Sequence, residues 1–130
     1  MTLANWCVLA ACLLPVVTIG LAKATAGKST STFSRYDNQQ PRLWAQQLTG
    51  WQQRAHAAQN NGFEALPLFI AAVVLAQQAH AAQGRIDQLA VLFVVLRVLY
   101  IGAYLLNLGT LRTLIWMSAT GTGIAILLMA

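Results

Sequence analysis

Residues 54–69 read Arg-Ala-His-Ala-Ala-Gln-Asn-Asn-Gly-Phe-Glu-Ala-Leu-Pro-Leu-Phe, and this stretch decides the fold because it runs from polar sequence directly into an apolar helix. At the rotation of an α-helix, the side chains of Arg54, Asn61 and Glu64 share a sector of roughly 80°. Glu64 precedes a long apolar run, where a carboxylate that faced lipid would be costly, so it must face protein or trapped water. The stretch therefore indicates either a polar pocket that grips a charged small molecule, or a structural helix with a buried ion pair.

The composition around this stretch is typical of a membrane protein. Hydrophobic residues make up 58% of the 130 residues and charged residues only 8%, whereas a typical soluble domain is about 25% charged. The formal net charge is +5. The basic residues are not clustered on one soluble module and form no recognisable nucleic-acid motif, so the excess indicates membrane topology rather than nucleic-acid binding. No metal site or hydrolase triad is recognisable.

Four apolar segments are expected to cross the membrane within one domain that comprises the whole chain: residues 3–22, 60–80, 86–106 and 111–129. The first has about the 20 residues that a span needs and carries no basic residue before Lys23, which favours a retained helix over a cleaved signal peptide. The second helix is expected to begin in the cytosol near residue 44 and to continue through Gly50 into its span. Gly84 and Gly109 mark the two later turns.

The basic residues predict the orientation of the chain. The first loop and the start of the second helix contain five of them: Lys23, Lys28, Arg35, Arg42 and Arg54. The third loop region adds Arg112, whereas the second loop has only Arg85 beside Asp87. The positive-inside rule therefore places the first and third loops in the cytosol and both termini on the non-cytosolic side.

A second polar group lies on the third span, where Arg97, Tyr100 and Tyr104 share a face of about 60°. An arginine at mid-bilayer costs about 2.5–3.5 kcal/mol on insertion scales, so Arg97 should have a partner. Glu64 is the acid expected within the apolar runs, and we predict that the two form an ion pair. The tyrosines could instead belong to an interfacial aromatic belt. His56, on another face of the second helix, is expected to face solvent rather than act in catalysis.

Taken together, these residues resemble the MAPEG family, the membrane-associated proteins in eicosanoid and glutathione metabolism. The second-helix signature is matched by Arg54, Asn61, Glu64, Pro67 and Phe69. The third-helix signature is matched by Arg97-Val-Leu-Tyr100-Ile-Gly-Ala-Tyr104, and Arg112 matches the basic residue that opens the fourth helix. The four-span layout agrees along the whole chain, and residues 36–42, Tyr-Asp-Asn-Gln-Gln-Pro-Arg, are similar to the bacterial branch.

The resemblance implies an all-α, integral membrane four-helix bundle that assembles as a homotrimer, in this case in a bacterial inner membrane. It also implies glutathione as co-substrate, bound at the cytosolic end between the second and third helices of neighbouring subunits, for reaction with a lipophilic small molecule. The candidate glutathione-binding residues are Arg54, Gln59, Asn61, Glu64, Arg97, Tyr100 and Tyr104. Arg112 and Tyr100 are the candidate catalytic residues, which would stabilise the thiolate.

The chain departs from the family pattern at two positions. Many members have a second arginine where this chain has Ala57, and members that bind glutathione well often have an aromatic residue at the position of Ala65. These positions keep open an alternative, a protein of the same fold that binds another amphiphile or is not catalytic. A four-helix proton-coupled exporter with Glu64 as proton carrier is a third interpretation. The long basic first loop, and an acid in the second span rather than the first, count against it.

Overall fold

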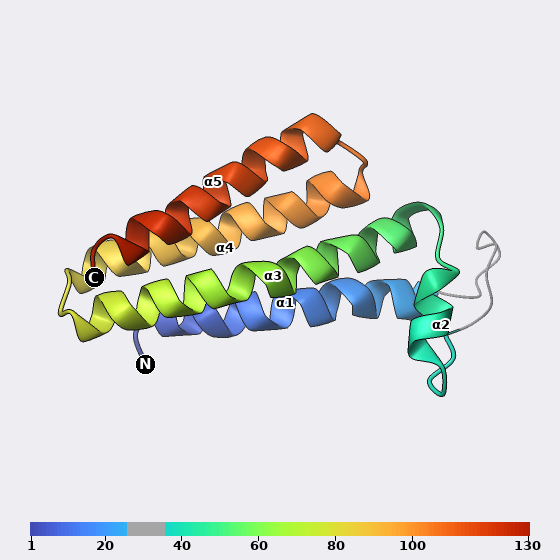
Figure 1. Cartoon of the computed structure of the whole chain (residues 1–130), viewed down its shortest axis with the longest axis horizontal. Coiled ribbons are helices and arrows are strands. Elements are labelled where there is room, and N and C mark those ends of the chain that lie inside the picture. The colour runs from blue at the N-terminus through green and yellow to red at the C-terminus, as the bar shows by residue number, and fades with distance from the viewer. Residues whose placement is uncertain (26–35) are drawn as a thin grey trace.

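The structure, a computed structural model, describes residues 1–25 and 36–130, and every regular element in these ranges is a helix. The helices are α1 (Leu3–Thr25), α2 (Pro41–Gln46), α3 (Gly50–Gln78), α4 (Gln83–Leu105) and α5 (Gly109–Leu127). The four long helices alternate in direction, so both termini lie at one end of the bundle and α2 lies across the other end (Figure 1). The predicted all-α fold is confirmed. Lys28 and Arg35, used above for the orientation, lie outside the described residues.

The bundle is held together by apolar contacts between close-packed helices. α1 packs against α3 and α4, and α5 packs against α4 and α3. At the centre, the rings of Phe69 and Phe93 stack with centroids 3.9 Å apart. Around them lie alanines with no exposed surface, whose small size lets the backbones approach: Ala4, Ala72, Ala76 and Ala90.

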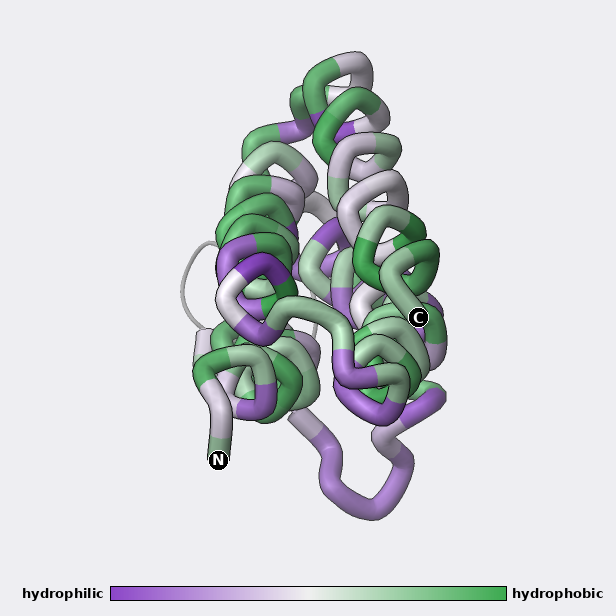
Figure 2. The backbone as a smooth tube through the Cα atoms, turned by 90° about the vertical axis from the view of Figure 1, so that its left-hand side faces the viewer, coloured by the Kyte–Doolittle hydropathy of each residue, from purple (hydrophilic) through white to green (hydrophobic). Residues whose placement is uncertain are grey.

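The outside of the bundle is also apolar. Hydrophobic colour runs along much of the long helices in Figure 2, and α1 and α4 are each long and apolar enough to cross a membrane. Large hydrophobic side chains face outward on these two helices, among them Leu13, Val17, Leu21, Val95 and Leu99. An apolar surface of this kind is suited to lipid rather than water.

The second helix is not continuous as predicted but is divided into α2 and α3. The backbone of Gly50 has φ +62°, a left-handed conformation that no α-helix continues through. Trp44 and Leu48 on either side of the end of α2 are each 3% exposed, and they anchor this short helix against the bundle. The sequence was expected to continue as a helix through Gly50. The apolar pattern did not show that Trp44 and Leu48 would be buried separately from α3, with a break in the helix between them and α3.

The two later turns also differ from the prediction in the residues that end the helices. His80 has φ 56° and Asn107 has φ 60°, so these two residues take the left-handed position just after α3 and α4. Gly84 instead lies in the first turn of α4, and Gly109 is the first residue of α5. The positions expected to stop the helices are therefore within the helices that follow.

At the end of the bundle that holds both termini, polar side chains tie α1 to its neighbours. The Oδ1 atom of Asp87 accepts hydrogen bonds from the backbone N–H of Ala4 and from Nε2 of Gln83, each 2.8 Å long. Gln77 donates to the hydroxyl of Thr2 at 2.9 Å. The carboxylate thus satisfies one of the free N–H groups at the start of α1 and favours that helix end electrostatically.

Candidate functional site

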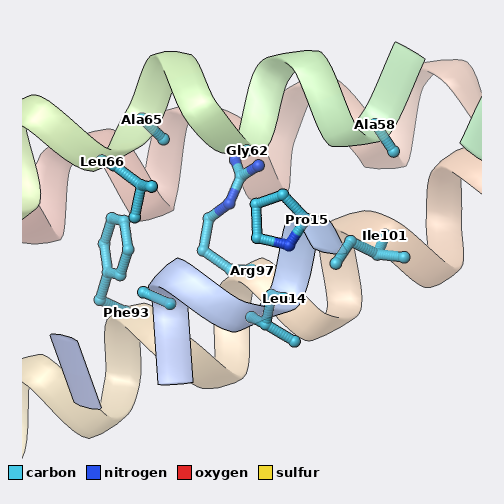
Figure 3. Close-up of a pocket in the computed structure, with 10 residues that line it drawn as sticks. Leu14, Pro15, Ala58, Gly62, Ala65, Leu66, Phe93, Arg97 and Ile101 are labelled. Carbon is cyan, nitrogen blue, oxygen red and sulfur yellow. The ribbon is translucent and has the colours of Figure 1, made fainter. Parts of the chain in front are cut away.

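Arg97 is the buried cation around which the site is arranged. Its side chain is 4% exposed and extends from α4 toward α3 at Gly62 (Figure 3). Its Nη1 atom donates a hydrogen bond of 3.0 Å to Oδ1 of Asn61. The guanidinium carbon also lies 4.3 Å from the centre of the Tyr100 ring, a cation–π contact. The structure therefore gives this mid-span arginine a neutral partner and an aromatic one.

The expected ion pair between Arg97 and Glu64 is not formed within the chain. Among the described residues, no salt bridge joins the two, and the carboxylate-bearing side chain of Glu64 is exposed on this single chain. Asn61 lies one helical turn closer to the guanidinium on the same side of α3 and takes its hydrogen bond instead. Helical spacing identified the shared face of α3 but did not show which residue on it the arginine would reach.

A second arginine–tyrosine pair continues the site toward the start of α5. The rings of Tyr100 and Tyr104 meet edge to face, with centroids 5.7 Å apart. The guanidinium carbon of Arg112 lies 4.3 Å from the centre of the Tyr104 ring. Neither tyrosine hydroxyl makes a hydrogen bond within the described ranges. Two cations and two free phenolic hydroxyls therefore follow one another along this edge of the bundle.

Two adjacent clefts give access to these side chains from between α3, α4 and α5. One has a volume of about 240 Å³ and is bordered by Asn61, Glu64, Arg97, Trp116 and Thr120, among others. The other has a volume of about 210 Å³ and is lined by Asn61, Tyr100, Tyr104, Arg112, Thr113 and Trp116. Asn61 and Trp116 line both, so the clefts share a wall. Of the α5 residues that line the clefts, Arg112 was predicted, whereas Thr113, Trp116 and Thr120 were not, because no charge or family signature marks these three positions in the sequence.

Arg54 does not belong to either cleft. Its Nε and Nη2 atoms donate hydrogen bonds of 3.1 and 3.0 Å to the backbone oxygen of Leu105, at the end of α4. A cation at this position satisfies a carbonyl that has no partner in its own helix and favours the negative end of the helix dipole. The structure therefore gives this predicted ligand-binding residue a contact that holds α3 to the end of α4.

Gln59 lies on a different side of α3 from Asn61. It lines a separate cleft of about 160 Å³ near α2, together with Lys23, Arg42 and His56. His56 was expected to face solvent, but it is half-buried, and its Nδ1 atom is buried without a hydrogen-bond partner among the described residues. Within one chain, the predicted site residues are therefore divided between two faces of α3.

Apolar outward-facing helices around a cationic, tyrosine-lined cleft define a helical integral membrane protein. Comparison with known families then identifies the family: the chain belongs to the MAPEG family, which matches residues 3–130. No curated protein and no solved structure matches the chain. The family predicted from the residues is confirmed over essentially the whole sequence.

Proposed function

We propose that this protein is a glutathione-dependent transferase or peroxidase that acts on lipophilic substrates, and that it works as a homotrimer. The observation that carries the proposal is the pair of clefts bordered by two stacked arginine–tyrosine pairs, Arg97 with Tyr100 and Arg112 with Tyr104. They combine positive charge, free hydroxyl groups and an apolar rim, which are the properties needed to hold a charged thiol compound against a hydrophobic acceptor.

The chemistry of the cleft residues fits glutathione. The tripeptide has two carboxylates, one ammonium group and a thiol. Half-buried Arg112 offers a guanidinium for a carboxylate. Glu64 borders the adjoining cleft and is free of other partners within the described residues, so it can receive the ammonium group. Asn61 retains its amide N–H groups as donors because its oxygen is the atom engaged by Arg97.

The reaction depends on the thiolate, because the thiolate is the nucleophile and a free cysteine thiol has a pKa of about 8.5. The positive charge of Arg112 and a hydrogen bond from the hydroxyl of Tyr100 would both favour the thiolate. In transfer, its sulfur forms a bond to an electrophilic carbon as the leaving group departs with the bonding electron pair. In peroxide reduction, two glutathione molecules give one disulfide while the hydroperoxide becomes an alcohol and water.

Two features of the single chain support assembly with further copies. Glu64 is exposed although it lies inside the expected second span, where contact with lipid would be costly. Gln59 and Asn61 line clefts on different sides of α3. A glutathione molecule that contacts both types of residue would therefore have to lie between two copies. A closed ring of three copies would cover the exposed carboxylate and complete each site.

The proposed sidedness follows from the same residues. Arg54, Arg112 and α2 lie at the end of the bundle opposite the two termini (Figure 1). By the positive-inside rule, the basic residues at this end support a cytosolic location for it, and the clefts would then open near the cytosolic face of a bacterial inner membrane. Glutathione would enter from the cytosol, and the lipophilic acceptor from the bilayer.

A second function, the binding of another amphiphile without catalysis, is favoured by Ala57 and Ala65. Ala65 lines the cleft of about 240 Å³ and supplies only a methyl group where an aromatic side chain would enclose a ligand. Ala57 borders a wider cleft of about 470 Å³ beside α2 and offers no charge there. Both positions reduce the polar and aromatic contacts available to glutathione.

Calorimetric titration of glutathione into the purified protein in detergent tests the proposal. The wild-type protein should bind, and Arg112→Ala should weaken binding about 10- to 100-fold, because a hydrogen bond to a charged group is worth about 1.5–3 kcal/mol. Arg85→Ala is the matched control, since Arg85 is exposed at the other end of the bundle. Absence of binding to the wild-type protein would favour the second function.

Turnover then separates catalysis from binding. Wild-type protein with glutathione should form a thioether with an aryl halide or convert a fatty-acid hydroperoxide to the alcohol, and Arg112→Ala should lower kcat more than it raises KM. Binding without either product would leave the chain as an amphiphile-binding member of the family. Proton uptake driven by a hydrophobic cation in liposomes would instead support the exporter.

A further inference from the structure

The inner side of Arg97 has an unused hydrogen-bond donor. Nη1 is bound to Asn61, but Nη2 is buried and has no partner among the described residues. The whole side chain is 4% exposed. A buried guanidinium N–H group without an acceptor carries a substantial desolvation cost, so such groups are nearly always satisfied by protein or by ordered water.

An unused acceptor lies opposite, on α1. Proline has no backbone N–H, so Pro15 cannot donate to the carbonyl of Ala11, the residue four positions earlier in the helix. Both residues are buried. A carbonyl oxygen in a helix points along the axis toward the residue that would normally donate to it, so this oxygen lies beside the proline ring. Buried helix carbonyls freed by proline in membrane proteins are satisfied by neighbouring groups or by water.

The residues that carry this donor and this acceptor line one small cavity between α1, α3 and α4. Ala11, Pro15 and Arg97 all contribute to its lining, and its volume is about 10 Å³. Figure 3 shows the guanidinium beside the proline ring beneath Gly62. A cavity needs on the order of 10–15 Å³ to hold one water molecule. The proline ring packs directly against Gly62 of α3, where an added Cβ atom would lie 2.8 Å from Cγ of Pro15.

We propose that this cavity is a binding site for one water molecule, which accepts a hydrogen bond from Nη2 of Arg97 and donates one to the backbone oxygen of Ala11. The water gives Pro15 a role as the source of the free acceptor. It also fixes the side chain of Arg97 through three contacts: Asn61, the ring of Tyr100, and α1 through the water. The proposal concerns the apoprotein and holds whether or not the protein binds glutathione.

A structure of the wild-type protein at a resolution that shows ordered water tests the proposal directly. Density for one water oxygen should lie within about 2.7–3.2 Å of both Nη2 of Arg97 and the oxygen of Ala11. An empty cavity would overturn the proposal, and so would a direct bond from Nη2 to a protein acceptor. The same experiment on Pro15→Ala should show the water lost or displaced, because the backbone N–H that this substitution restores would donate to the oxygen of Ala11.

A double-mutant cycle with Pro15→Ala and Arg97→Lys measures the coupling in solution. In a wild-type background, removal of Pro15 should lower the Tm or leave it unchanged, because the gain of a helix hydrogen bond is offset by the loss of the acceptor for the water. In the Arg97→Lys background, whose side chain lacks the second nitrogen, the same substitution should raise the Tm. Equal shifts in the two backgrounds would refute the bridge. Should Arg97→Lys fail to fold, density in the wild-type structure alone decides.

Discussion

Among the described residues, the buried guanidinium of Arg97 donates a hydrogen bond to one side-chain oxygen, that of Asn61. The uncharged Asn61 does not neutralise the cation, but the face of the Tyr100 ring attracts it through a cation–π contact. The hydrogen-bond partner of Arg97 is therefore neutral, and Glu64, which borders the same cleft, forms no salt bridge with it within the described residues. An anionic group of a ligand would meet a guanidinium that is not paired with a carboxylate.

Asn61→Ala should reduce the free energy of unfolding by about 1.5–3 kcal/mol, since it removes a hydrogen bond to a buried charged group. Chemical unfolding in detergent measures the change. Asn60→Ala is the matched control, because the neighbouring asparagine is exposed and should tolerate the substitution. Equal losses for the two variants would show that Asn61 does not support the guanidinium.

Helical spacing in the sequence predicted some of the site residues but not all of their contacts. Asn61, Tyr100, Tyr104 and Arg112 were predicted and do line one pair of clefts. Helical periodicity identifies residues that share a face of one helix, and the apolar pattern around them orients that face inward. It does not determine which side chain of a neighbouring helix is within reach, and for this reason the acceptor for the buried cation was predicted to be Glu64.

At the scale of the helices, Arg54 joins the first turns of α3 to the last residue of α4. Its two bonds to Leu105 hold the end of α4 against the polar half of α3. The polar start of α3 was interpreted as a cytosolic extension, and its charge as part of a ligand site. Backbone carbonyls at helix ends are invisible to sequence patterns, so this partner could not have been chosen from the residues.

Arg54→Gln should therefore loosen the last turn of α4, with a loss of about 1–2 kcal/mol, because the charge on the helix end and one hydrogen bond disappear. Amide hydrogen exchange over the last turn of α4 reports the change locally. Arg42→Gln, which alters an exposed arginine of α2, should leave that exchange as it is in the wild type. Faster exchange in both variants, or in neither, would argue against the capping role.

The break between α2 and α3 requires glycine at position 50. Gly50→Ala should lower stability by roughly 1–2 kcal/mol, because a side chain in the left-handed conformation meets the following carbonyl. Gly20→Ala is the control, since Gly20 lies inside α1 with nothing within 4 Å of an added Cβ atom. Thermal unfolding of the two variants should move in different directions or differ clearly in size. A loss no larger for Gly50→Ala than for Gly20→Ala would contradict a required left-handed turn.

Both helix-ending turns show why element types were easier to predict than their boundaries. The long apolar runs indicated four helices, and four long helices are present. Glycine is the residue most often used for a left-handed stop, but His80 and Asn107 occupy these positions here. Asparagine and histidine are among the non-glycine residues that adopt this conformation most readily.

For the whole molecule, the distribution of charge predicts one orientation. A reporter that is active only in the cytosol should be inactive when fused after Ala130 and active when inserted beside α2. The two sites lie at opposite ends of the bundle, so each is a control for the other. The reverse pattern would overturn the orientation and place the clefts on the non-cytosolic side.

Assembly is tested by native mass spectrometry in mild detergent, where we expect three copies. Glu64→Leu should weaken the trimer, because the proposed ring covers this carboxylate at the interface between copies. An unchanged trimer would show that the carboxylate makes no contact across the interface. Phe63→Ala, beside it on α3 and 45% exposed in the single chain, provides a matched change in the same surface. A stable monomer with full activity would refute the trimer and with it the shared site.

The hydrogen bond between Asn61 and Arg97 also bears on how the protein enters the membrane during synthesis. Asn61 precedes Arg97 by 36 residues, so α3 has left the ribosome before the arginine of α4 reaches the translocon. An isolated α4 would have to pass its cation into lipid alone, at a cost of about 2.5–3.5 kcal/mol. Because α3 is already present, Asn61 would accept the hydrogen bond of Arg97 while α4 passes from the translocon into the lipid. The two helices would then enter the bilayer together, as one hairpin.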